Sequence, residues 1–347
     1  MKALFRVDAS ADIGLGHLMR CLALAQTLAR ENFEIIFVCQ HQTQNIALSR
    51  QDWVGGIVVI PEGFTQAQEL DWLAMLNEMQ QADVVIIDGY QFDSGYRQRL
   101  RAMAKKLVVF DDNNNSGELH GDLVINGANN AAELGYKISA PNAQYCLGSD
   151  YRILRQEFIQ LDEVPWSQRH SLCIMMGGSD PLNITLPLLE ALQQQNASMP
   201  IRVMTGAAYP FMDDLQAFIR QSPMAIQHLA NCQQVAEIVS QSRLAISAAG
   251  GSQFEILACH TPTMLMVVAD NQRNATLQSA KQGWCDILEA NNQALLHDHF
   301  PAIAIQIMLL WDDEAKLMAM HQQTQQHADT QGCQRVLQAM QNMLAVA

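Results

Sequence analysis

Short apolar runs alternate with helical stretches along the chain, and this alternation limits the fold more than any other feature of the sequence. In the first half, runs rich in β-branched residues occur at 4–7, 35–39, 56–60, 84–88, 107–111 and 123–126. The longer stretches between them have helical apolar spacing, as at 18–29, 67–79 and 95–105. Strands that are apolar throughout are buried on both faces, so the pattern predicts a parallel sheet with helices on both sides.

The same alternation starts again in the second half. Strands are expected at 172–176, 201–204, 225–229, 244–247 and 264–268, and helices at 182–194, 210–221, 233–241, 252–259 and 273–282. Beyond residue 300 only helical spacing remains, at 301–311, 314–326 and 334–344. We therefore predict an α/β protein with Rossmann-like domains at 1–150 and 151–310, and a helical segment at 311–347 that packs back toward the first domain. Two doubly wound domains facing a cleft, followed by C-terminal helices, is the GT-B layout.

Charge and composition exclude several classes of function. The chain has 347 residues and a net charge of −14, and each half carries −7. No basic patch is available for nucleic acid or an anionic membrane, so neither is expected as a partner. The N-terminus lacks the apolar stretch of an export signal, and no apolar run is long enough to span a bilayer, which predicts a cytoplasmic protein. The eight cysteines show no CxxC spacing and are interpreted as free thiols.

The first strand leads into a glycine turn with Gly14 and Gly16, followed by His17 and Arg20. The third glycine of a dinucleotide fingerprint is replaced by Met19, which argues against that function. Instead, the turn places His17 in the first turn of a helix, where the helix N-terminus favours a neutral imidazole able to accept a proton. The alternative is a histidine that only caps the helix. Arg20 lies on the same helix face and is a candidate substrate ligand.

Two further glycine turns follow strands in the second half. Both can offer backbone N–H groups to phosphate oxygens, which suggests a diphosphate ligand. The candidate ligands are Gly177, Gly178 and Ser179 in the first turn, and Ala249, Gly250, Gly251 and Ser252 in the second. Glu255 lies one helical turn further on, at a distance suited to ribose hydroxyls. The pair Ser252 and Glu255 also fits a capping box, and the sequence leaves both interpretations open.

Polar residues follow two neighbouring strands, at Asp88 and Tyr90 and at Asp111, Asp112 and Asn113. They are candidates for a polar wall of the site. Adjacent Asp111 and Asp112 point to opposite faces, which disfavours a metal chelate. The His297 and His299 pair lacks a third ligand nearby. No metal and no cofactor is therefore expected.

Five segments form an ordered set that covers nearly the whole chain. They are RVDAS at 6–10, IGLGHLMRCLALA at 13–25, IDGY at 87–90, LGSDYRILRQEF at 147–158 and GGSD at 177–180. This set resembles the UDP-sugar hydrolases of pseudaminic acid biosynthesis, relatives of the GT-B glycosyltransferase that builds the peptidoglycan lipid precursor.

The resemblance implies hydrolysis of UDP-2,4-diacetamido-2,4,6-trideoxy-β-L-altropyranose to UDP and the free sugar. Water would attack the anomeric carbon with inversion and C–O cleavage, without a metal. His17 would be the base, Tyr90 a residue near the sugar and Glu255 the ribose ligand. Leu229 and Asn271 would contact UDP, with Asn274 as the alternative to Asn271. A GT-B glycosyltransferase with a UDP-sugar donor and a non-catalytic nucleotide-sugar-binding protein remain the alternatives. Protein partners and oligomeric state cannot be inferred.

Overall fold

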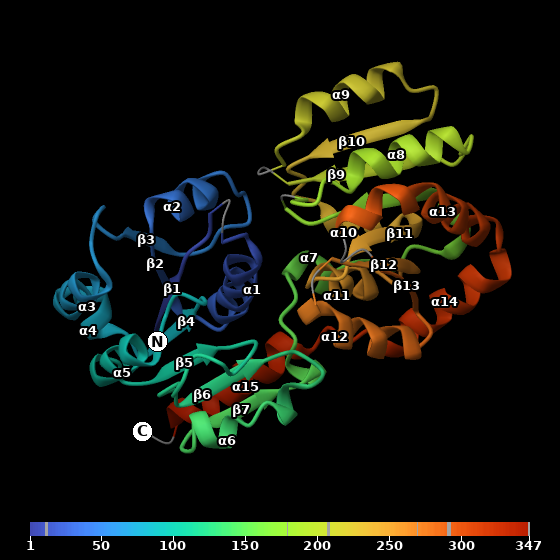
Figure 1. The fold of residues 1–347 in the computed structure, drawn as a ribbon. Helices are drawn as coiled ribbons and strands as arrows, with labels where there is room; N and C mark the ends of the chain where they lie inside the picture. Colours follow the sequence, from blue (N-terminus) through green and yellow to red (C-terminus); the bar gives the residue numbers. More distant parts are fainter. Residues whose placement is uncertain (11–12, 179, 207–208, 269, 290–292, 346–347) are drawn as a thin grey trace. The chain divides into compact units, whose positions relative to one another are not determined.

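The computed structural model describes residues 1–10, 13–178, 180–206, 209–268, 270–289 and 293–345. The chain divides into two compact units (Figure 1), residues 1–156 with 329–347 and residues 157–328. The sequence predicts domain boundaries after residues 150 and 310. The observed divisions follow Gln156 and Ala328, so the helix α14 (Glu314–His327) lies in the second unit rather than with the terminal segment.

The first unit is built on a seven-stranded parallel sheet in the order β3-β2-β1-β4-β5-β6-β7. Its strands are β1 (Lys2–Val7), β2 (Glu34–Cys39), β3 (Gly56–Val59), β4 (Val84–Asp88), β5 (Leu107–Phe110), β6 (Leu123–Asn126) and β7 (Gln144–Leu147). Its helices are α1 (Gly16–Arg30), α2 (His41–Leu48), α3 (Gln66–Met75), α4 (Asn77–Gln81), α5 (Ser94–Met103), α6 (Tyr136–Ser139) and α15 (Gly332–Ala345). Two short 3₁₀ turns lie at Ala131–Glu133 and Ser149–Tyr151. The doubly wound sheet predicted from the apolar runs is confirmed.

Alternate residues of each central strand fill two different cores. Phe5 of β1 and Ile86 of β4 pack with α1 and α15 on one face of the sheet. Leu4 and Val85 pack with α3 and α5 on the other face. Because both faces are covered, the central strands carry apolar side chains on both faces, and polar residues such as Asp88 lie at strand ends.

Helix α15 returns to the first unit, where it packs against α1, β6 and β7 (Figure 1). Its first residue is Gly332. A Cβ atom built there would lie 1.9 Å from the backbone oxygen of Arg152, a distance that no side chain tolerates. Glycine is therefore required for this close approach of two backbones.

The second unit contains a six-stranded parallel sheet in the order β10-β9-β8-β11-β12-β13. Its strands are β8 (Ser171–Met175), β9 (Ile201–Thr205), β10 (Ile226–Ala230), β11 (Ser242–Ala248), β12 (Thr263–Val267) and β13 (Cys285–Glu289). Its helices, besides α14, are α8 (Thr185–Gln194), α9 (Met212–Gln221), α10 (Val235–Ser240), α11 (Ser252–Ala258), α12 (Asp270–Lys281) and α13 (Gln293–Asp312). The short helix α7 (Gln156–Ile159) begins at the boundary of the units, and a 3₁₀ turn occupies Trp166–Gln168.

One expected helix is divided into two in the structure. The stretch 67–79 forms α3 and α4, separated at Leu76, whose backbone is extended. A capping box between Thr65 and Gln68 fixes the start of α3.

Within the described ranges, no helix is both long and apolar enough to cross a membrane.

Candidate functional site

The turn after β1 delivers His17 to the carboxyl edge of the first sheet. Gly14 has a φ of 81° and its amide bonds the carbonyl oxygen of Ser10, so the turn closes on itself. Helix α1 begins at Gly16, which makes His17 its second residue, and no side chain caps this helix start. The imidazole is 8% exposed and bonds another element of the sheet. The interpretation of His17 as a simple helix cap is therefore not supported.

His17 forms a hydrogen bond with Asp88, the last residue of β4. The Nδ1 atom lies 2.7 Å from the Oδ1 atom of Asp88, whose side chain is 1% exposed. Burial raises the pKa of Asp88, but the charge and hydrogen bonds of Arg20 together with His17 outweigh it and lower the pKa to about 2. A carboxylate only accepts hydrogen bonds, so Nδ1 carries a proton, and in the neutral form of the imidazole the lone pair is on Nε2.

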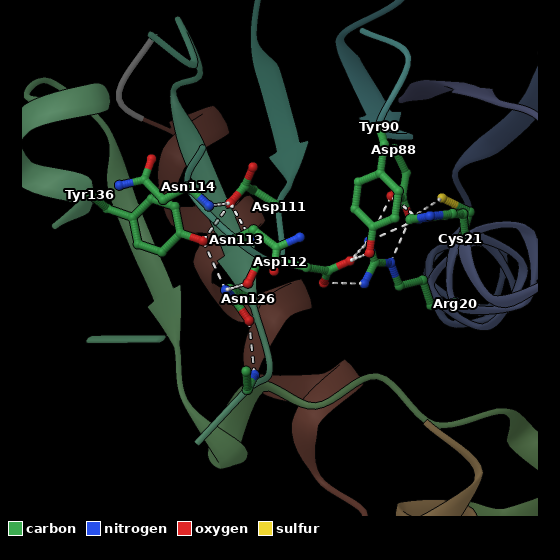
Figure 2. A network of polar contacts seen from close by, with 12 residues as sticks. Arg20, Cys21, Asp88, Tyr90, Asp111, Asp112, Asn113, Asn114, Asn126 and Tyr136 are labelled. Carbon is green, nitrogen blue, oxygen red and sulfur yellow. Dashed lines mark hydrogen bonds and ion pairs between the residues drawn. The ribbon is translucent and has the colours of Figure 1, made fainter. Parts of the chain in front are cut away.

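Arg20 holds the Asp88 carboxylate in place from the next turn of α1. Its Nε and Nη2 atoms donate to the two oxygens of Asp88 at 2.6 and 2.7 Å. Its Nη1 atom donates to Asp112 at 2.6 Å, just beyond β5 (Figure 2). The buried thiol of Cys21 also points to Asp88, at 3.6 Å. The guanidinium is thus engaged with two carboxylates and positions both of them.

Tyr90 joins the same network from the turn after β4. Its hydroxyl donates to Asp112 at 2.8 Å, and its ring meets that of His17 edge to face at 4.6 Å between centroids. The pKa of Tyr90 is raised by partial burial and by the Asp112 carboxylate, so the phenol stays protonated. With 66% of its surface exposed, Tyr90 offers a ring face and not a base.

The carboxylates of Asp111 and Asp112 have different hydrogen-bond partners, as Figure 2 shows. Asp111 accepts hydrogen bonds from the Tyr136 hydroxyl at 2.6 Å and from the backbone of Asn114 at 2.6 Å. Asn126 donates to Tyr136 and links the end of β6 to this network. The expectation that the two carboxylates do not share a ligand agrees with this geometry. In the described part of the chain, no group of three or more His, Cys, Asp or Glu side chains is placed to hold a metal ion.

A pocket of about 440 Å³ opens beside this network within the first unit. It is bordered by the ends of β4 and β5 and by the loop that follows β5. The lining residues are Arg20, Asp88, Gly89, Tyr90, Arg97, Phe110, Asp111, Asn113, Asn115 and Ser116. We call it the β5-loop pocket.

The first glycine turn of the second unit differs from the expectation. Helix α8 begins at Thr185 and not at residue 182, and Asp180 adopts a φ of 44°. The carboxylate of Asp180 accepts hydrogen bonds from the amides of Ile184 and Thr185 at 2.8–3.1 Å. These helix-end amides are therefore occupied by the protein's own carboxylate and are not free for a phosphate, which corrects that part of the prediction. Gly177 and Gly178 form the turn, and Ser179 lies outside the described residues.

The second glycine turn leads directly from β11 into α11, as expected. Ser252 is the first helical residue and Gly251 the cap, and no side chain caps this start. A capping box needs the serine at the cap position, so the box with Glu255 is not formed. The Ala249 amide bonds the oxygen of Met266 and anchors the turn to β12.

The other two residues assigned to UDP belong to neighbouring elements. Leu229 lies in β10 and is partly buried. Asn271 lies in α12, but its side chain and that of Asn274 are outside the described residues. The same holds for the His297 side chain, while His299 is exposed.

Sequence reasoning found His17, Arg20 and Tyr90 but did not pair them with Asp88 and Asp112. The available signal was the position of both acids after strands that end at one sheet edge. His17 and Asp88 are 71 positions apart in the sequence, and Arg20 and Asp112 are 92 positions apart. These contacts depend on β1 and β4 being neighbours in the sheet.

The architecture is that of the GT-B class. The structure of Acinetobacter baumannii MurG superposes with a TM-score of 0.65 at 18% identity, over 99% of this chain and 100% of that one. Phytolacca americana UGT2, solved with UDP-2-fluoroglucose and pterostilbene, gives a TM-score of 0.65 at 12% identity, over 99% of both chains. These similarities confirm the predicted fold class. The chain matches no protein-family profile.

Three curated proteins are similar to this chain in sequence. The UDP-2,4-diacetamido-2,4,6-trideoxy-β-L-altropyranose hydrolase of Campylobacter jejuni is 23% identical, over 82% of this chain and 98% of that protein. The spore coat polysaccharide biosynthesis protein SpsG of Bacillus subtilis is 22% identical over 80% of each chain. MJ1062 of Methanocaldococcus jannaschii is 28% identical over 79% of this chain, and the match spans 57% of its length. The chain is thus a distant relative of these proteins.

Proposed function

We propose that the protein is an enzyme that acts on a UDP-sugar and hydrolyses UDP-2,4-diacetamido-2,4,6-trideoxy-β-L-altropyranose to UDP and the free sugar. The observation that carries the proposal is the 2.7 Å hydrogen bond between His17 and Asp88, because it holds the ring by Nδ1 and directs the lone pair of the neutral imidazole to Nε2. The similarity to the Campylobacter hydrolase, which extends over 98% of that protein, supports the choice of substrate.

In the proposed reaction, the Nε2 atom of His17 accepts a proton from a water molecule. The water oxygen forms a bond with the anomeric carbon from the face opposite the diphosphate, so the configuration inverts. The bond from the anomeric carbon to the diphosphate oxygen breaks, and its electron pair leaves with UDP. Asp88 stabilises the imidazolium that forms, and general-base catalysis of this kind contributes about 10²–10⁴-fold.

The second unit would bind UDP. The turn of Gly250, Gly251 and Ser252 would donate backbone N–H groups to the diphosphate, where negative charge develops as the bond breaks. The amide of Ala249 is bonded to the Met266 oxygen, so Ala249 would only hold this turn in place. Glu255, one helical turn beyond this turn, would accept hydrogen bonds from the ribose hydroxyls. The turn of Gly177, Gly178 and Ser179 would contact UDP through its backbone. Leu229 and Asn271 would contact the uridine part of UDP. No metal or cofactor is part of this scheme, because UDP leaves as a stable anion.

Release of UDP measured by phosphorus NMR tests the reaction. The purified protein is incubated with the UDP-sugar in water enriched in oxygen-18, without any acceptor. Hydrolysis by C–O cleavage places the label in the sugar, whereas attack at phosphorus places it in UDP. Absence of UDP release from a protein that binds the UDP-sugar would contradict the proposal.

A glycosyltransferase is the second candidate, because fold neighbours such as UGT2 share this architecture. His17 would then take its proton from an acceptor hydroxyl instead of water. The same assay with sugar and lipid-linked acceptors distinguishes the two, since a transferase releases UDP only when an acceptor is present. A protein that binds the UDP-sugar without turnover under either condition would be a binding protein.

A further inference from the structure

The loop after β5 carries three consecutive asparagines with two different roles. The side chain of Asn114 is held by the protein, because it donates to the Leu134 oxygen at 2.6 Å and accepts from Ser139 at 2.6 Å. Its φ of 48° is one that asparagine tolerates better than most residues. Asn114 therefore shapes the loop.

Asn113 and Asn115 flank this anchor and line the β5-loop pocket. Both are exposed, and neither amide side chain has a hydrogen-bond partner among the described residues. An amide offers one acceptor and two donor hydrogens, which is the complement of another amide. The pocket thus presents two unused amide groups on a loop whose centre is fixed.

The charged side chains that line the pocket balance in number, and each forms hydrogen bonds within the protein. Two of the lining side chains are basic and two are acidic. Arg20 is paired with Asp88. Arg97 donates to the backbone oxygens of Phe92 and Ser116 at 2.7 and 2.8 Å. Asp111 accepts from Tyr136. The pocket therefore suits an uncharged, hydrogen-bonding ligand and not a phosphate.

Tyr90 connects the pocket to the proposed base. Its side chain lines the pocket, and its ring contacts the ring of His17. A sugar whose anomeric carbon lies near His17 would extend past this exposed ring into the pocket. The volume of about 440 Å³ is sufficient for a monosaccharide with acyl substituents.

We propose that the β5-loop pocket binds the sugar of the substrate, and that Asn113 and Asn115 recognise its acetamido groups. This inference rests on the proposed function, since it assigns the sugar half of that substrate to these two residues. The specificity for an N-acylated sugar then resides in the first unit, while the affinity for the nucleotide resides elsewhere.

The test compares the double variant N113A/N115A with N142A, a change at an exposed asparagine outside the pocket lining. Calorimetry measures the dissociation constants of UDP and of UDP-2,4-diacetamido-2,4,6-trideoxy-β-L-altropyranose, and the NMR assay gives KM and kcat. We expect the double variant to weaken UDP-sugar binding and raise KM by about 10–100-fold, as loss of two to four hydrogen bonds implies. UDP affinity and the melting temperature should stay near wild type, as should all values for N142A.

The outcomes separate this inference from the proposed function. Turnover with an unchanged KM in the double variant overturns the role of the two asparagines and leaves the hydrolase intact. If the wild-type protein binds the UDP-sugar tightly without turnover, and only the double variant binds it more weakly, the sugar-binding role of the pocket is supported and the hydrolase activity is overturned. Wild-type protein that binds the UDP-sugar no better than UDP overturns the pocket as a sugar site.

Discussion

The Nδ1 atom of His17 lies 2.7 Å from Oδ1 of Asp88, although 71 positions separate the two residues in the sequence. The contact exists because β1 and β4 are neighbours in the sheet, so the helix that follows β1 begins beside the end of β4. Arg20 fixes the carboxylate from the same helix. The tautomer of the imidazole is therefore determined by the topology of the sheet.

Replacement of the proposed base tests the mechanism directly. His17→Asn removes Nε2 but leaves a small polar side chain beside Asp88, so we expect kcat to fall by about 10²–10⁴-fold. UDP affinity measured by calorimetry should change less than twofold. The control is His41→Asn, at an exposed histidine at the start of α2. A His17→Asn enzyme with near-normal kcat would remove His17 from the reaction.

Asp88→Asn should reduce kcat with little change in UDP affinity. The amide that replaces the carboxylate can donate to Nδ1, which favours the tautomer with the proton on Nε2, and the loss should reach about 10²–10⁴-fold. Asp112→Asn serves as the matched control, because it changes the other carboxylate of Arg20 without touching the imidazole. An equal loss of kcat in the two variants would show that Asp88 acts by holding Arg20 and not by orienting the imidazole.

Stability should depend on pH through Asp88. Its pKa is about 2 in the folded protein and 3.8 ordinarily, so folding favours the ionised form. The stabilisation is complete above pH 4 and is lost as the pH falls from about 4 to about 2, and it amounts to about 2 kcal/mol. Urea unfolding at pH 7 and pH 3 measures it. The gap in unfolding free energy between wild type and Asp88→Asn should narrow at the lower pH, and a constant gap would contradict the assignment.

Glu255→Ala should weaken UDP binding by about tenfold, the effect of losing hydrogen bonds to a charged acceptor. For a residue that acts through the nucleotide, the melting temperature of the unliganded protein should stay near the wild-type value. Calorimetry and thermal unfolding give the two values, with the exposed Glu237→Ala on α10 for comparison. Unchanged UDP affinity together with a lowered melting temperature would assign Glu255 a structural role.

Gly332→Ala should destabilise the first unit by several kcal/mol, because the added methyl group would overlap the backbone of Arg152 and force α15 to shift. Gln334→Ala, at an exposed position of the same helix, should be nearly neutral. Denaturant unfolding measures both variants. A Gly332→Ala protein of wild-type stability would mean that α15 accommodates the methyl group by a small movement.

Much of the fold could be predicted from the sequence, because buried parallel strands are continuous apolar runs. The elements that were missed are short or lie at sheet edges. Strand β7 has four residues, β13 is interrupted by Asp286, and α2 lacks a side-chain cap. None of them carries a strong local signal.

The site was predictable only in part, for a different reason. The glycine turn made His17 predictable, because Gly14, Gly16 and His17 are neighbours in the sequence. The start of α8 was placed three residues too early, because the sequence does not show that Asp180 turns its carboxylate onto the amides of Ile184 and Thr185. The partners of Arg20 come from two other strands, and local patterns do not determine which acid faces which base.

The position of α15 has a consequence for how the protein is made. The first unit consists of residues 1–156 together with 329–347, so its closing helix leaves the ribosome only after the whole second unit. At ordinary rates of translation this interval is on the order of ten seconds. During that time α1, which carries His17, lacks the helix that covers one side of its core. The second unit can thus reach its native state first, and the proposed catalytic residues acquire their final support only after the second unit has been synthesised.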